Sequence, residues 1–257
     1  MRFALMDEQR VEATPGQVAA CPSCGEVMIA KCGTRVVWHW AHKGQRCDGW
    51  WEPESPWHRG WKDQFPAEWQ ETVCEGDDGE RHVADVLTSH GLVIEFQHSP
   101  LPAREQMVRE GFYRNMVWVV DGSRDERDVA RFRMFKQYFY KTHLDGILVC
   151  SDPGACFPAP WLGAGAIVVF DFGGDLSLQC VKSLKDNVWC LLPGHFGGRV
   201  LVAPLPRAEF IRMAHEQSFL YEVEGIVAAM EAHFRKEEAQ WFGRPPRNSA
   251  YVGWKRL

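Results

Sequence analysis

Polar and apolar positions alternate regularly over residues 81–97, RHVADVLTSHGLVIEFQ. The alternation predicts two short strands joined by a turn at residues 88–91, where Thr-Ser-His-Gly interrupts the apolar positions. Side chains two apart on a strand share a face, so Glu95 and Gln97 project together while the intervening apolar residues point to the opposite face. The hairpin therefore brings Asp85 of the first strand beside Glu95.

The residues before this hairpin predict a helix. Ser55 can cap it and Pro56 fits its first turn. Trp57, Trp61 and Phe65 then recur every four residues, which indicates a side that faces the protein core.

Further elements surround the hairpin. A strand over residues 71–75 completes a three-stranded antiparallel meander. A second helix, capped by Ser99, runs to about residue 115, with an apolar side formed by Leu101, Met107, Val108, Phe112 and Tyr113. Residues 116–120 are continuously apolar, which predicts a buried strand parallel to its neighbour.

The second half of the chain has shorter and less regular patterns. We expect a helix within residues 121–142, helices within 207–242, an irregular tail after residue 243, and short strands at 146–150, 167–170, 176–181, 188–192 and 199–202. The predicted domains are residues 1–49 for a metal-binding module, 50–142 for a core of helix, three strands, helix and strand, and 143–257 for a C-terminal α/β region whose role the sequence does not reveal.

Cysteine and histidine spacing singles out residues 21–47. Cys21-x2-Cys24 is followed, after fourteen intervening residues, by His39-x2-His42, and tetrahedral zinc prefers such thiolate and imidazole ligands. The gap between the histidines is shorter than in a helical finger, so we expect a ribbon-like hairpin of residues 27–30 and 35–38. Cys32 and Cys47 compete with this ligand set. The predicted zinc ion is structural, because so small a segment cannot build a stable core alone.

Composition narrows the class of protein. The 257 residues are 46% hydrophobic and 25% charged, as in an ordinary soluble globular protein, and no apolar run is long enough to span a membrane. The polar start of the chain predicts no secretory signal, so we expect the nine cysteines to be reduced or metal-bound and the protein to be cytoplasmic. A net charge of −5 excludes a general basic coat for nucleic acid but leaves a local basic surface open.

The hairpin also predicts chemistry. The carboxylates of Asp85 and Glu95 and the amide of Gln97 form the oxygen-rich ligand set that magnesium or manganese prefers. Asp85, nine intervening residues and Glu95-x-Gln97 resemble the D…(E/D)xK signature of the PD-(D/E)xK nucleases, with Gln97 in place of lysine. Taken with Cys-Pro-x-Cys and His-Trp-Ala-His upstream, the segments ADV at 84–86 and IEFQHS at 94–99 resemble the competence protein CoiA family.

This resemblance implies an α/β (α+β) fold with a restriction-endonuclease-like αβββαβ core. It also implies a metal-dependent nuclease that acts on DNA, with RNA as the alternative substrate, in recombination, DNA-uptake processing or defence against foreign DNA. In such nucleases the helix before the sheet often supplies an acid to the metal site, which here is Glu54, with His58 and Lys62 as further candidates. Gln97 is neutral and cannot act as a base, so it would orient the attacking water or ligate the metal.

Gln97 also supports a second hypothesis, a non-catalytic adaptor for nucleic acid or protein in which the zinc module docks and the core is degenerate. The paired acids favour the enzyme, because their mutual repulsion costs stability unless a cation lies between them. The sequence leaves open the oligomeric state, any protein partner, and the choice between endonuclease and exonuclease.

Overall fold

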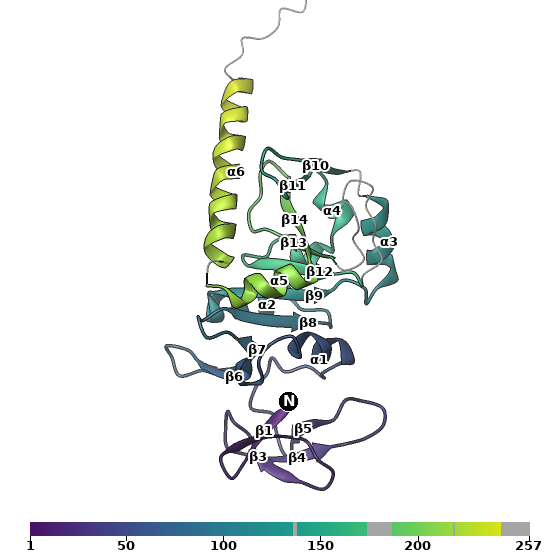
Figure 1. Cartoon of the computed structure of the whole chain (residues 1–257), viewed down its shortest axis with the longest axis vertical. Helices are drawn as coiled ribbons and strands as arrows, with labels where there is room; N and C mark the ends of the chain where they lie inside the picture. Colours follow the sequence, from purple (N-terminus) through teal and green to yellow (C-terminus); the bar gives the residue numbers. More distant parts are fainter. Residues whose placement is uncertain (136–137, 174–186, 218, 243–257) are drawn as a thin grey trace, which may run out of the picture.

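The computed structural model describes residues 1–135, 138–173, 187–217 and 219–242. Within these residues the chain forms two β-sheets, of five and nine strands, and six α-helices. The small sheet lies at one end of the molecule and the large sheet forms its centre (Figure 1). The expected α+β class is confirmed.

The five-stranded sheet is built from the first 42 residues in the order β2–β1–β3–β4–β5. Its strands are β1 (Phe3–Met6), β2 (Gln9–Glu12), β3 (Val18–Ala20), β4 (Val27–Lys31) and β5 (His39–His42). The predicted hairpin is present as β4–β5, but its second strand begins at His39, because residues 32–38 form the connecting loop. Met28 and Trp40 are buried in the small core of this sheet.

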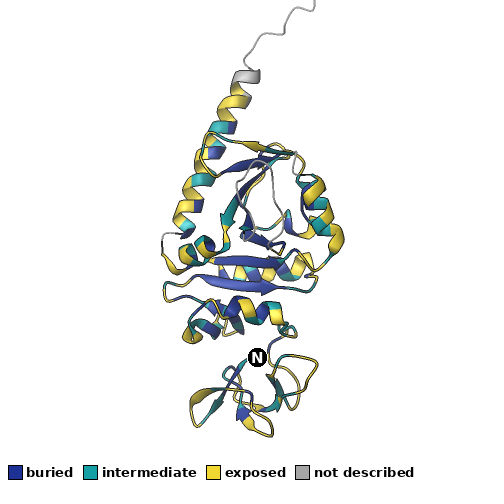
Figure 2. Ribbon diagram, turned by 45° about the vertical axis from the view of Figure 1, so that its right-hand side comes forward, coloured by how far each residue is buried: buried dark blue, intermediate teal, exposed yellow. Residues whose placement is uncertain are grey.

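The nine-stranded sheet has the order β10–β11–β14–β13–β12–β9–β8–β7–β6. Its strands are β6 (Gln70–Glu75), β7 (Arg81–Leu87), β8 (Val93–Gln97), β9 (Met116–Asp121), β10 (Phe139–Lys141), β11 (Leu148–Cys150), β12 (Ile167–Asp171), β13 (Asn187–Leu191) and β14 (Val200–Pro206). β9 runs parallel to both β8 and β12. Separate apolar clusters cover the two faces, which explains why β9 and β12 are apolar on both sides (Figure 2).

Six helices accompany the sheets. They are α1 (Pro56–Lys62), α2 (Ala103–Tyr113), α3 (Glu126–Met134), α4 (Pro153–Cys156), α5 (Arg207–His215) and α6 (Phe219–Phe242). None of these described helices combines the length and apolar character that a membrane crossing requires.

Residues 56–121 follow the predicted order of helix, three antiparallel strands, helix and parallel strand. Ser55 caps α1 with Pro56 in its first turn, as predicted, and Trp61 and Phe65 are buried in the core. Ser99 does not cap α2, which begins at Ala103 after Pro102.

The strands after residue 143 extend the same sheet. β12 pairs with β9, and β13, β14, β11 and β10 follow in turn. The predicted boundary between residues 142 and 143 therefore crosses one continuous sheet, while α5 packs on β13 and β14. The expected strand at 176–181 and the tail after residue 243 lie outside the described residues.

Candidate functional site

β7 and β8 separate where the two predicted metal-binding acids lie. The ladder between them pairs Val86 with Ile94 and Leu87 with Val93, and it ends there. Beyond this point side chains replace main-chain pairing: the Asp85 amide donates to Glu95 Oε1 at 3.2 Å, and the Phe96 amide donates to Asp85 Oδ2 at 3.0 Å. The two strands are thus bridged by their own carboxylates, and Asp85 and Glu95 are brought together as predicted.

On its other side, Asp85 faces a third acid. The β6–β7 ladder pairs Gln70 with Val86 and Thr72 with Ala84, which leaves Glu71 opposite Asp85 without a ladder bond. Glu71 has a φ of 48°, an uncommon conformation for a residue other than glycine, and its side chain is buried. Three acids therefore follow one another across β6, β7 and β8.

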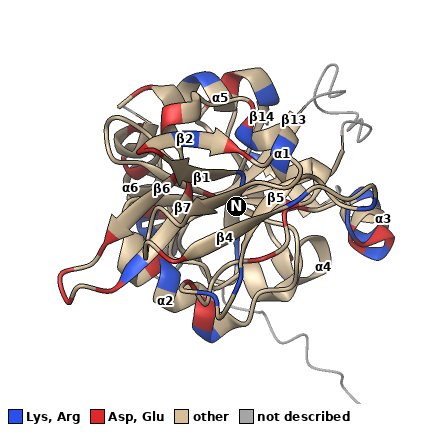
Figure 3. Cartoon of the chain, turned by 90° about the horizontal axis from the view of Figure 1, so that it is seen from below, with Lys and Arg blue, Asp and Glu red and all other residues tan. Residues whose placement is uncertain are grey.

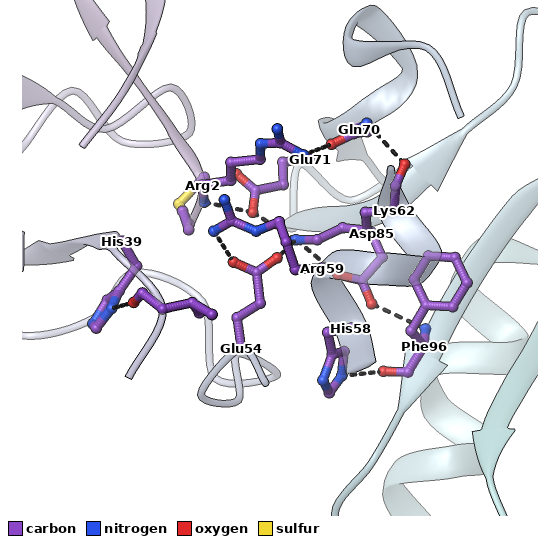
Figure 4. A network of polar contacts seen from close by, with 12 residues as sticks. Arg2, His39, Glu54, His58, Arg59, Lys62, Gln70, Glu71, Asp85 and Phe96 are labelled. Atoms are coloured by element: carbon purple, nitrogen blue, oxygen red, sulfur yellow. Dashed lines mark hydrogen bonds and ion pairs between the residues drawn. The ribbon is translucent and has the colours of Figure 1, made fainter. Parts of the chain in front are cut away.

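Lys62 of α1 neutralises part of this row. Its buried ammonium lies 2.8 Å from Glu71 Oε1, 2.6 Å from Glu54 Oε1 and 3.7 Å from Asp85 Oδ1 (Figure 4). Burial alone would lower the pKa of Lys62, but Glu71, Asp85 and Glu54 raise it above its usual range. Burial would likewise raise the pKa of Glu71, yet Lys62 holds it at about 2. Lys62 therefore remains charged.

Glu95 is the acid that is least well compensated. It is buried, and its nearest cation is Arg109 of α2, whose Nη1 lies 3.3 Å from Glu95 Oε2. Burial, together with the charge of Asp85, raises the pKa of Glu95 to about 8 despite Arg109. The pKa of Asp85 is also raised, chiefly by burial, although Lys62 and His58 oppose the shift. A pair of acids in this state favours a bound cation.

Arg109 reaches Glu95 from the buried face of α2. Gln106, Arg109 and Tyr113 are its buried residues, whereas Met107 is 71% exposed and Val108 49% exposed. The predicted apolar side of this helix was therefore wrong for both Met107 and Val108. The helix turns a polar face inward because Arg109 pairs with Glu95 there.

His58 of α1 fills the opening between the strands. Its Nε2 lies 2.6 Å from the Phe96 carbonyl (Figure 4). The same atom lies 2.8 Å from Glu52 Oε1. Both partners are acceptors, so Nε2 carries the proton. Burial alone would lower the pKa of His58, but Glu52 and Asp85 raise it overall.

Gln97 and Glu54 occupy more peripheral positions. Gln97 Nε2 donates to Glu52 Oε2 at 3.1 Å and to the Ser99 carbonyl at 2.9 Å. Glu54 pairs with Arg59 and Lys62, so it reaches Asp85 only through Lys62. The acid that contacts both His58 and Gln97 is Glu52, which the sequence analysis did not select.

The carboxylates of Asp85 and Glu95 and the carbonyl of Phe96 are oxygen donors that could hold a divalent cation. This oxygen set suits magnesium or manganese, and a cation would offset the negative charge of two carboxylates whose pKa values are raised chiefly by burial. Among the described residues, three or more His, Cys, Asp or Glu donor atoms lie within 4.8 Å of one another at one place, a second cluster in the N-terminal region, and the acidic site is not such a group.

The second cluster consists of Cys21, Cys24, His42 and Cys47. Cys21 Sγ lies 3.7 Å from Cys47 Sγ, and Cys24 Sγ lies 3.4 Å from His42 Nε2. Three thiols and one imidazole match the tetrahedral preference of zinc. Burial, with Cys24 and Cys21 nearby, raises the pKa of Cys47 to about 12, so a cation is needed to stabilise the thiolates. This cluster could hold the predicted zinc ion.

One predicted zinc ligand is corrected by this geometry. His39 and His42 stand three apart on β5, so their side chains leave opposite faces of the strand. His42 faces the cysteines, whereas His39 Nδ1 bonds the Val37 carbonyl at 2.9 Å. Cys47, which competed for the ligand set, takes the fourth place instead of His39, and Cys32 stays outside the cluster.

A cavity of about 350 Å³ joins the two clusters. His42 and Cys47 line it from the small sheet, and Glu52, His58, Asp85 and Glu95 line it from the large one. Asp48 fixes the small sheet beside β7 by bonding His82 Nδ1 at 3.0 Å and the Val83 amide at 2.9 Å. His82 is buried and stacks on Trp50.

Comparison with known families decides what the small sheet is. Residues 7–49 match the family model described as "Competence protein CoiA, N-terminal domain". Over these residues the chain is similar to the competence protein CoiA family. The match ends one residue after Asp48 and so covers all four members of the Cys/His cluster but none of the large sheet. No curated protein matches the chain, and no solved structure does.

In this CoiA-like chain the partners of the predicted residues were the hardest to foresee. Glu52, Glu71 and Arg109 each contact a predicted residue that belongs to a different structural element. No local pattern marks them. Cys47 was accessible to reasoning, since the odd spacing of His39 and His42 within a strand already places them on opposite faces.

Proposed function

We propose that this CoiA-like chain is a metal-dependent nuclease that hydrolyses phosphodiester bonds in DNA and serves a competence-related role. The family match supports the competence-related role. The main observation in support of nuclease activity is the acid pair of half-buried Asp85 and buried Glu95, which lies where β7 and β8 separate and opens on the cavity. Its surroundings, with the order of helix, three strands, helix and strand, support a core of the PD-(D/E)xK type.

Asp85, Glu95 and the Phe96 carbonyl would hold magnesium or manganese. When bound, such an ion supplies an acidified water and offsets charge on the phosphoryl oxygens. The protein supplies the remaining groups. Lys62 is the fixed positive charge beside Asp85, in a position to balance the negative charge of a bound phosphate.

His58 is the group that holds a proton. Its Nε2–H points to the Phe96 carbonyl and is backed by Glu52, an arrangement that favours the protonated ring. We assign it the delivery of a proton to the leaving oxygen. Gln97 positions Glu52 through its amide nitrogen, and its neutral side chain does not act as a base.

The test is cleavage of end-labelled DNA, linear and circular, single- and double-stranded, with magnesium, manganese or EDTA. Asp85→Asn and Glu95→Gln should each reduce cutting by about a hundredfold or more, since each removes a metal ligand. Glu75→Gln and Asp77→Asn, which change exposed acids in the same way, should cut like the wild type. Cutting that persists in both ligand variants would overturn the proposal.

The second candidate is the adaptor without catalysis. Gln97 favours this adaptor, because it occupies the position of the usual lysine and its amide nitrogen donates hydrogen bonds to Glu52 and the Ser99 carbonyl. DNA that is bound but remains intact with every metal would support it. Circular DNA that is cut would exclude it and establish an endonuclease.

A further inference from the structure

The small sheet carries a basic segment on an acidic chain. Residues 27–47 contain four basic residues and no Asp or Glu, a charge of +4 − 0 = +4, whereas the whole chain has a net charge of −5. The basic residues are Lys31, Arg35, Lys43 and Arg46. All four are exposed, and none forms an ion pair with any residue that the structure describes. Such cations are available to phosphates.

Aromatic rings lie among these cations. Trp38 is 49% exposed in the β4–β5 loop, where its Nε1 bonds the Gly33 carbonyl at 3.1 Å. Arg46 lies over the Trp51 ring at 4.2 Å from its centroid, and His39 lies 6.4 Å from the same ring. One exposed ring and two half-buried rings therefore lie among these cations, and rings interleaved with cations are typical of surfaces that stack bases and follow a phosphate backbone.

This surface leads to the acid pair. His39, Arg46 and Trp51 line the same cavity as Asp85 and Glu95. The small sheet covers that cavity and is attached to the rest of the protein on two sides. Asp48 accepts a hydrogen bond from β7, and Arg59 donates to the Trp38 carbonyl at 3.1 Å. Figure 3 looks onto the molecule from this end.

The size of the cavity selects the ligand. A volume of about 350 Å³ is that of a pocket for one small ligand, comparable with a single nucleotide, and it cannot admit a turn of duplex. A nucleotide could reach the acids only from a strand that is unpaired at that point.

We infer that the basic, aromatic segment of residues 27–47 with Trp51 is a binding face for single-stranded DNA, and that it feeds one unpaired strand into the cavity of the acid pair. The inference rests on the proposed nuclease function for the destination of the strand. The binding face itself is testable without cleavage.

The experiment measures fluorescence anisotropy of a labelled oligothymidine with the full chain carrying Asp85→Asn, without added divalent ion. Trp38→Ala and Arg46→Ala should each weaken binding about tenfold, since one stacked base or one cation is lost. Arg46→Ala should also reduce the slope of log K against log salt by about 0.7. Trp38→Phe keeps a ring and should retain most of the affinity, which separates stacking from loop geometry.

Matched controls come from elsewhere on the surface. Tyr140→Ala removes a 57% exposed ring and Arg114→Ala an exposed cation, and both should bind like the parent. Unchanged affinity in Trp38→Ala and Arg46→Ala would overturn the binding face. Equal affinity for a duplex of the same length would overturn the preference for a single strand, and tighter binding of the RNA counterpart would overturn DNA as the ligand.

The proposed nuclease activity and the proposed binding face can each be disproved without the other. Wild-type cutting in manganese with Trp38→Ala binding unchanged would leave the nuclease and remove the face. No cutting, with binding that depends on Trp38 and Arg46, would leave the face and remove the nuclease.

Discussion

Glu95 Oε1 accepts a hydrogen bond from the backbone amide of Asp85 at 3.2 Å, so one carboxylate of the pair is held by the strand that carries the other. The Phe96 amide returns the same contact to Asp85 Oδ2. Neither acid can move without breaking a bond to the other strand. The two acids are therefore already positioned for a cation in the folded protein. Holding them close together has an electrostatic cost, which lowers the free energy of unfolding.

That cost predicts an unusual pH dependence of stability. Glu95 has a pKa of about 8 in the folded state against an ordinary value of 4.5, so between these values the folded protein holds a proton that the unfolded chain has lost. The free energy of unfolding should therefore fall as pH rises from 5 to 8, by a few kcal/mol at about 1.4 kcal/mol per pKa unit.

Urea denaturation at several pH values, without divalent ions, measures this slope. Glu95→Gln should lose most of it and be more stable than the wild type at pH 8. His58, whose pKa is also raised, contributes a slope of the same sign, but it is present in both proteins and cancels in the comparison. A wild-type slope that persists in Glu95→Gln would contradict the assignment to Glu95.

Removal of Lys62 should strongly destabilise the protein. Lys62→Met leaves Glu54, Glu71 and Asp85 around a neutral side chain, and breaking a buried ion pair costs about 3–5 kcal/mol. The measurement is urea denaturation at pH 7. Lys141→Met, at an exposed position, should change stability by less than about 0.5 kcal/mol.

A second substitution checks the cause. Glu71→Gln added to Lys62→Met removes one uncompensated charge and should recover part of the loss. If the double variant is less stable than Lys62→Met alone, repulsion among the acids is not the reason.

The Cys/His cluster predicts which substitutions release zinc. Cys47→Ser should lose the metal, while His39→Ala and Cys32→Ser should retain about one zinc ion per chain, measured by elemental analysis of purified protein. Loss of zinc should also lower the melting temperature, because the ion stabilises a small sheet with a small core. Retention in Cys47→Ser with loss in His39→Ala would restore the ligand set predicted from spacing.

Asp171 of β12 ties α1 to the start of α5. Its Oδ2 accepts from Trp57 Nε1 at 2.9 Å and from Trp61 Nε1 at 3.0 Å, and Oδ1 lies 2.7 Å from Arg207. Asp171→Asn should reduce the free energy of unfolding by about 3 kcal/mol, because it leaves this buried set partly unpaired. Thermal denaturation measures the loss, and Asp145→Asn at an exposed position is the control. A wild-type melting temperature in Asp171→Asn would show that the Trp contacts suffice.

The elements from α1 to β9 were predictable because their signals are local. Ser55 and Pro56 mark the start of α1, and the alternation around Asp85 and Glu95 marks two strands. A hairpin also fixes which residues face each other, so the acid pair followed from the sequence.

The partners of the acid pair were not predictable in the same way. Arg109 and Glu71 meet Glu95 and Lys62 across separate elements, and hydrophobic periodicity assigns a polar residue to solvent by default. That rule placed Met107 in the core and Arg109 outside it, the reverse of the observed burial. A buried charge on a helix is decided by what lies opposite, which a single sequence does not specify.

The position of β9 inside the nine-stranded sheet limits how the chain can be cut into fragments. It is flanked by β8 and β12, and its residues from Met116 to Val120 are buried. A chain cut after residue 142 would keep the acid pair but strip β12 from β9, exposing a long apolar edge with unpaired amides and carbonyls. Such a fragment would self-associate through that edge. The segment that contains the acids would therefore not stay soluble as a monomer without the strands that follow it in the sheet.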